Sequence, residues 1–220
     1  MRTPVRCWVA NHRVARRVLS VALLAAAVAQ PLPAFEYPLS SEAIRDAYFL
    51  ANGNQDKRTE FLRKYKHALP APKSGPDVSL IQIQTPFTDV VDDLASGDPN
   101  DRAQEIEQKY LGKAGHFRVH VEIYFTPSYP GPGFDTAQLA DLWQDFKVRL
   151  KQDAKMEPLS THGDPIYTYG SDGGPVAIVG ANVDLEYDMD KLDAGGITTI
   201  DVDTPDGQEV ETSFALNSLR

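Results

Sequence analysis

Between residues 116 and 125 the chain reads HFRVHVEIYF, in which polar and apolar side chains alternate without a break. The five apolar positions of this stretch are Phe117, Val119, Val121, Ile123 and Phe125. An alternation with a period of two puts all of these side chains on one face of an extended chain. The stretch is therefore predicted to be a half-buried strand of an antiparallel sheet.

Further strands are expected on both sides of this one. Turn residues separate them, as in the predicted hairpins whose turns are Ser171-Asp172-Gly173-Gly174 and Thr204-Pro205-Asp206-Gly207. The expected strands cover residues 78–87, about 144–151, 156–160, 166–170, 176–189, 197–203 and 209–216. Residues 136–151 fit a helix as well as a strand, and we favour a short helix to about Leu142 followed by a strand. About eight short strands with few helices between them predict a β-sandwich.

Helical patterns precede and interrupt the strands. Ser40-Ser41-Glu42 is typical of a helix start. A second helix is expected from Thr59, and its apolar face would consist of Phe61, Leu62, Tyr65 and Leu69. Asp98-Pro99 indicates the start of a third helix, which ends at Gly112. The predicted fold class is α+β and β-dominated: an antiparallel sandwich with N-terminal helices and one helical excursion. The predicted segments are a signal peptide (1–34), a helical segment with a linker (35–75) and the sandwich domain (76–220), with a helical insertion near 88–112.

Residues 1–34 have the pattern of a secretory signal. They contain five arginines and no acidic residue, and an apolar run of about a dozen residues follows the basic part. Cleavage is expected after Ala29 or Ala34. A retained anchor is disfavoured because crossing a membrane takes about 20 apolar residues. We therefore expect a periplasmic or secreted protein with no stable membrane insertion after cleavage, exported by the general or the twin-arginine route.

The charge balance limits the class of partner. The chain has 22 basic and 31 acidic side chains, and removal of the five arginines leaves 17 basic ones and a formal charge of −14. Such a surface repels phosphate backbones, so we expect no nucleic-acid partner. Cys7 lies inside the predicted signal, so the mature chain has no disulfide, no thiolate metal site and no cysteine nucleophile.

One stretch carries a resemblance. Residues 35–50, FEYPLSSEAIRDAYFL, resemble the opening of a group of uncharacterised exported bacterial proteins. The turn at 204–207 and the ending FALNSLR at 214–220 are also similar to theirs. The resemblance implies export and carries no activity or ligand.

The densest run of acids gives the one candidate metal site. Asp188, Asp190 and Asp193 lie in a predicted loop that is rich in oxygen ligands, which calcium prefers. Asp172 and Asp206 lie in other turns and are candidates to converge on it. The spacing departs from that of an EF-hand, so a solvated acidic face is the competing interpretation. His116 and His120 are about 13 Å apart on an extended strand, too far to share one metal ion.

Tyr167 and Tyr169 share one face of a predicted strand and are candidates to stack on a ligand, although core packing explains them equally well. No nucleophile elbow, zinc motif or phosphate loop is present in the sequence. The predicted function is therefore a non-catalytic interaction module for an unknown ligand, with a protein or a surface glycan as partner and no cofactor. A calcium-dependent surface- or glycan-binding module and a hydrolase whose carboxylates meet only in the fold are the alternatives.

Overall fold

The computed structural model describes residues 36–97, 102–113, 115–129, 141–169 and 175–220. The chain divides into two compact units, Met1–Leu32 and Pro33–Arg220, and every described helix and strand belongs to the second. Both hydrophobic clusters lie in this unit, so it contains the core that its own folding requires. The predicted signal peptide and its two cleavage points lie outside the described residues.

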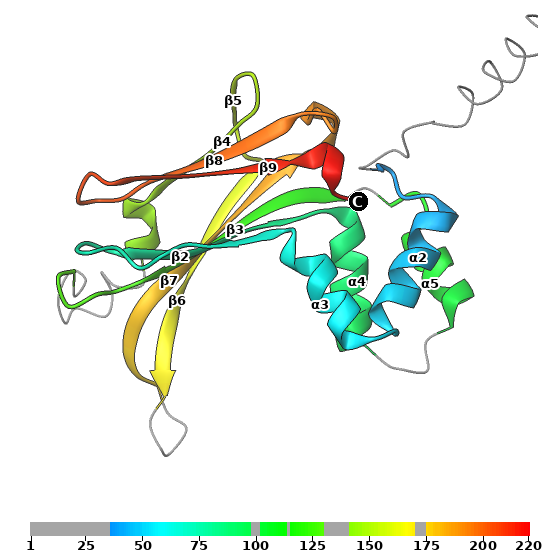
Figure 1. Ribbon diagram of the computed structural model, residues 1–220, viewed down its shortest axis with the longest axis horizontal. Coiled ribbons are helices and arrows are strands. Elements are labelled where there is room, and N and C mark those ends of the chain that lie inside the picture. The colour runs from blue at the N-terminus through cyan, green and yellow to red at the C-terminus, as the bar shows by residue number, and fades with distance from the viewer. Residues whose placement is uncertain (1–35, 98–101, 114, 130–140, 170–174) are drawn as a thin grey trace, which may run out of the picture. The chain divides into compact units, whose positions relative to one another are not determined.

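Two antiparallel sheets form the larger part of the second unit (Figure 1). The first has five strands in the order β1-β2-β3-β7-β6, and the second has four in the order β5-β4-β8-β9. The strands of the first sheet are β1 (Lys66–Ala68), β2 (Asp77–Gln84), β3 (His116–Tyr124), β6 (Ser160–Tyr169) and β7 (Pro175–Asp188). Those of the second are β4 (Lys147–Lys151), β5 (Lys155–Met156), β8 (Ile197–Asp203) and β9 (Glu209–Ala215).

The main hydrophobic cluster joins the two sheets. From β3 it takes the apolar side chains of the alternating stretch, of which Phe117, Val119, Val121 and Ile123 are fully buried. From the second sheet it takes residues such as Leu150 and Ile200, which are equally buried. The two faces therefore pack on each other as in a β-sandwich, and the predicted fold class is confirmed.

The helices gather at one end of the sheets (Figure 1) and have a hydrophobic cluster of their own. They are α2 (Ser41–Ala51), α3 (Gln55–Arg63), α4 (Pro86–Ser96) and α5 (Ala103–Tyr110). Ser40 caps α2 with its hydroxyl, as predicted, because Ser40 Oγ accepts a hydrogen bond from the N–H of Ala43. Short 3₁₀ turns, among them η1 (Leu142–Asp145) and η2 (Met189–Lys191), complete the elements.

The second helix differs from its prediction. It begins at Gln55, where Asn54 caps it through bonds from the N–H groups of Asp56 and Lys57, and it ends at Arg63. Tyr65 and Leu69, which were predicted to extend it, instead flank β1. The apolar spacing of this segment fits a helix, but pairing of β1 with β2 satisfies its backbone in another way.

The predicted strand at 78–87 is wrong at its end. β2 stops at Gln84 because Thr85 caps α4, with Pro86 at its first position. The hydroxyls of Thr85 and Thr88 each accept a bond from the other's backbone N–H, and Phe87 is buried among the helices. The helix that was predicted to start at Asp98-Pro99 is α5, which begins at Ala103. Its predicted cap, Asp98-Pro99, lies outside the described residues. The hairpins β6–β7 and β8–β9 and the strand after Leu142 are confirmed. β6 begins at Ser160 and not at Ile166, so the separate strand predicted for 156–160 is wrong, and β5 covers only Lys155–Met156. The turn predicted at 171–174 lies outside the described residues.

Candidate interaction surface

The end of the β6–β7 hairpin carries the most exposed aromatic residues of the sheets. Tyr167 is 41% and Tyr169 is 68% exposed. Leu159, which is 54% exposed, lies at the opposite end of β6, just before Ser160. Monomeric proteins expose few large apolar side chains in one place, and those that gather often mark a contact surface. Both tyrosines were candidates either to stack on a ligand or to pack on the core, and the structure leaves both rings accessible.

Among the residues that the structure describes, two strands alone form this end of the hairpin. β3 pairs with β7 as far as Tyr124 opposite Gly180, and the N–H of Phe125 adds one bond to the carbonyl of Val179. Beyond that point β7 pairs with β6 alone, and Figure 1 shows the two strands running past their neighbours. A two-stranded hairpin is marginally stable by itself, so this end has backbone and side chains available for a partner.

The base of the hairpin is fixed by a tryptophan. η1 places the ring of Trp143 directly against Gly163 of β6, where an added Cβ would lie 2.1 Å from the ring. Only glycine allows this contact, because any other side chain would displace the ring. The Trp143 packing therefore sets the position from which the hairpin projects.

A hollow of about 310 Å³ opens between the sheets beside the start of β6. Apolar side chains from both sheets line it, among them Met156, Pro158 and Leu185, and Thr161 of β6 borders it. It lies on the same face of β6 as Leu159 and Tyr167, because residues two apart on a strand share a face. A concavity lined by both apolar and charged side chains, among them Arg149 and Lys155, is suited to receive an amphipathic side chain of a partner.

The outer face of the five-stranded sheet is polar, and histidine side chains on it contact acidic side chains. His120 Nδ1 is hydrogen bonded to Asp184 Oδ1 at 2.8 Å, and Glu122 lies 3.7 Å from His120 Nε2. The hydrogen bond to Asp184 is the main cause that raises the pKa of His120. His162 lies on the other side of Asp184 and makes an ion pair with Asp164 at 3.2 Å.

A second hollow, of about 360 Å³, lies beside α4, and three acids of that helix are among the polar residues that line it. Burial raises the pKa of Asp89, whose carboxylate pairs with Arg118 at 2.6 Å. Partial loss of hydration also raises the pKa of Asp92 at its rim. Asp93 accepts a bond from Lys109 at 2.8 Å and one from Tyr110. This site was not predicted from the sequence. The Thr85-Pro86 cap of α4 is the signal that would have placed these acids on one helix.

Two of the predicted calcium ligands, Asp188 and Asp193, accept hydrogen bonds from backbone N–H groups of their own turns. Asp188 caps η2 by accepting a bond from the N–H of Asp190, and Lys191 lies 3.5 Å from its other oxygen. Asp193 accepts a bond from the N–H of Gly195. Among the residues that the structure describes, no three histidine, cysteine or acidic side chains are arranged to hold a metal ion.

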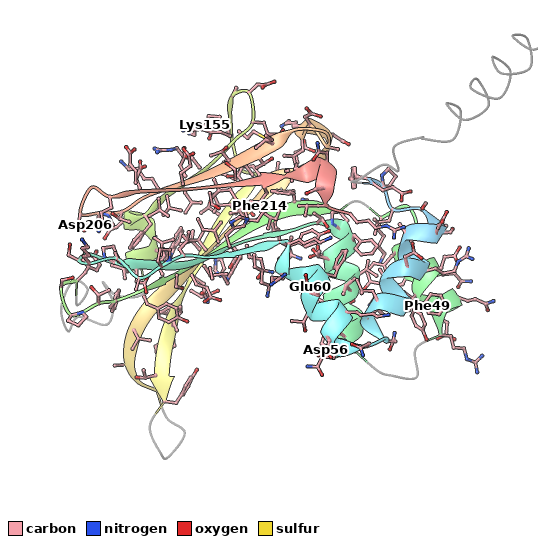
Figure 2. The ribbon with its side chains drawn as sticks, in the orientation of Figure 1. Phe49, Asp56, Glu60, Lys155, Asp206 and Phe214 are labelled. Carbon is pink, nitrogen blue, oxygen red and sulfur yellow. The ribbon has the colours of Figure 1, made fainter. Side chains whose placement is uncertain are left out.

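The two other acids do not complete that site. Asp206 (labelled in Figure 2) lies in the turn that follows β8 and accepts a bond from Thr204. Asp193 precedes β8, so the length of this strand lies between the two acids. Asp172 lies outside the described residues. Cross-strand neighbours such as His120 and Asp184 were also not predicted, because the sequence of neither strand determines the register in which the two strands pair.

No protein-family model, curated protein or solved structure matches this chain. In the part of the chain that the structure describes, no helix is both long enough and apolar enough to cross a membrane.

Proposed function

We propose that this protein is an exported, non-catalytic interaction module whose binding element is the β6–β7 hairpin. The exposure of Tyr167 and Tyr169 carries the proposal. Tyrosine is enriched in protein interfaces because it combines a large apolar ring with a polar group. The basic and apolar pattern of residues 1–34 supports export, where the hairpin would meet partners outside the cytoplasm.

The carboxylates beside α4 support this proposal over the hydrolase alternative. A pair of carboxylates that works as acid and base needs both groups free to exchange protons with substrate. Asp89 is held by Arg118, and Asp93 is held by Lys109 and Tyr110. Among the described residues, Asp92 is thus the one carboxylate of this hollow without a hydrogen-bonding partner.

Site-specific photo-crosslinking in the producing cells tests the proposed binding element. A photoreactive phenylalanine analogue replaces Tyr169, and the matched control carries it at Phe49, which is 66% exposed on α2 (Figure 2). We expect a discrete adduct, with a protein or a glycan, from position 169 and none from position 49. The proposal is overturned if position 169 gives no adduct, or if both positions give the same ones.

A further inference from the structure

We propose that the partner at this surface is a second copy of the chain, joined by antiparallel pairing of β6 with β6 about a two-fold axis at Gly163. This inference rests on the proposed function, because it names the partner of the same hairpin. Pairing two identical edges in this way gives a closed, isologous dimer. The two five-stranded sheets would then become one continuous sheet.

The edge of β6 is free for such pairing. β6 is the last strand in the order of its sheet, and among the described residues no strand lies on its outer side. Ser160, Thr161 and His162 at its start are all exposed. Exposed edges pair readily with other strands, and proteins limit this with proline. Pro165 removes one donor from each copy but leaves the backbone of Gly163 at the centre available.

The two-fold register matches charges across the axis. With Gly163 opposite Gly163, residue 162 of one copy lies opposite residue 164 of the other. His162 therefore meets Asp164 of the second copy, and Asp164 meets its His162. Both side chains are well exposed in the single chain, at 71% and 63%. The contact forms twice in the dimer, and opposite charges in directly opposed positions stabilise a strand pair.

The same register matches the apolar residues. Leu159 lies opposite Tyr167 of the second copy, so the two exposed apolar side chains cover each other on one face of the joined sheet. The hollow beside Met156, Pro158 and Thr161 opens on that face and next to Leu159. The second copy's Tyr167 would reach it. One choice of axis thus accounts for the exposed Leu159, the exposed Tyr167 and the hollow.

The edge of the second sheet at β9 is unsuited to self-pairing. β9 is the last strand of the four-stranded sheet, and its sequence EVETSFA contains two acids and no basic residue. Whatever the register, a second copy of β9 has no basic side chain to place opposite Glu209 or Glu211. β9 therefore provides a matched control edge.

Sedimentation of the compact unit, residues 33–220, tests the inference over about 1 µM to 1 mM, the range in which modest interfaces dissociate. We expect a monomer–dimer equilibrium in this range. His162→Asp and Asp164→Lys should each weaken dimerisation at least about tenfold, because each substitution acts twice across the axis. An equimolar mixture of the two variants should recover the dimer. In the mixed pair the carboxylate introduced by the first substitution faces the ammonium group introduced by the second, and the remaining Asp164 faces the remaining His162.

The controls separate this inference from the proposed function. Tyr167→Ala should weaken the dimer, whereas Glu211→Lys on β9 should leave it unchanged. Three results would each overturn the pairing of β6. The unit could stay monomeric throughout, the mixture of variants could fail to recover the dimer, or Glu211→Lys could weaken the dimer. A monomeric unit that still gives adducts from position 169 would refute self-association and leave the proposed function standing. A monomer without adducts would refute both.

Discussion

At the scale of single residues, the polar face of the five-stranded sheet is organised by one hydrogen bond. His120 and Asp184 lie on adjacent strands in directly opposed positions, 2.8 Å apart. The imidazole is largely shielded from solvent, and Glu122 lies on its other side. A protonated imidazole between two carboxylates is favoured in the folded chain, because unfolding separates all three groups.

Asp184→Asn should therefore lower stability in a pH-dependent way. The pKa of His120 is raised in the folded chain, mainly by the hydrogen bond to Asp184, so the folded state holds its proton more tightly than the unfolded state does. This contribution is complete below the ordinary histidine pKa of about 6.5 and is lost as the pH rises through the folded value. Urea unfolding between about pH 5 and 8 should show the largest loss of stability at the acidic end.

A double-mutant cycle provides the control. His120→Asn should also remove the pH-dependent contribution of this pair to stability. The double variant should lose no more of that contribution than either single variant does. A loss that is the same at every pH would show that Asp184 contributes by packing alone. This hydrogen bond could not be predicted from the sequence, because His120 and Asp184 are 64 residues apart and only the strand register brings them together.

At the scale of elements, a buried tyrosine joins β1, the chain end and the helices. The hydroxyl of Tyr65 donates to the carbonyl of Arg220 and accepts from its N–H, both at 2.8 Å, and burial raises the pKa of Tyr65 to about 12. Arg220 in turn makes an ion pair with Asp46 of α2 and lies over the ring of Phe87 of α4. The helices are thus held to the sandwich by polar contacts as well as by packing.

Tyr65→Phe should cost about 1–3 kcal/mol, because it leaves the N–H of Arg220 without a partner and its carbonyl with only the longer bond from Thr85. In a chain of this size each kcal/mol lowers the melting temperature by about 2–4 °C. Chemical unfolding should show a lower midpoint and an unchanged slope. Tyr169→Phe, at an exposed ring, is the matched control and should change stability by less than about 0.5 kcal/mol. An equal effect of the two substitutions would contradict this role for Tyr65.

The elements differ in how far the sequence predicts them, and the reason is where their stability comes from. β3 is predictable because one unbroken alternation places every apolar side chain in the core. α4 is harder to predict because Val78–Phe87 looks like a continuous strand until Thr85 and Pro86 are considered as a cap. The hairpin and its two tyrosines could be placed from the turn residues. Their exposure could not, since it depends on where β3 ends beside them.

At the scale of the whole molecule, net negative charge is the property that most affects cation binding. A chain with 31 acidic side chains attracts cations diffusely, and diffuse attraction depends on ionic strength rather than on the identity of the ion. A built calcium site would instead need several oxygen ligands around one point. Asp188 and Asp193 are occupied by backbone N–H groups of their own turns, which favours the diffuse case.

We therefore expect thermal unfolding of residues 33–220 to be the same in millimolar calcium, in magnesium and in chelator, once sodium chloride has equalised the ionic strength. A specific ion at a hundred times its dissociation constant would add about 2.7 kcal/mol, and at about 2–4 °C per kcal/mol this would raise the melting temperature by roughly 5–10 °C. A shift of that size in calcium alone would contradict our expectation, and Asp190→Asn should then abolish it. A shift common to both divalent ions would indicate screening of the acidic surface beyond what sodium chloride provides. Coincident curves would mean that the acids of residues 184–193 keep the sheet face solvated and bind no specific ion.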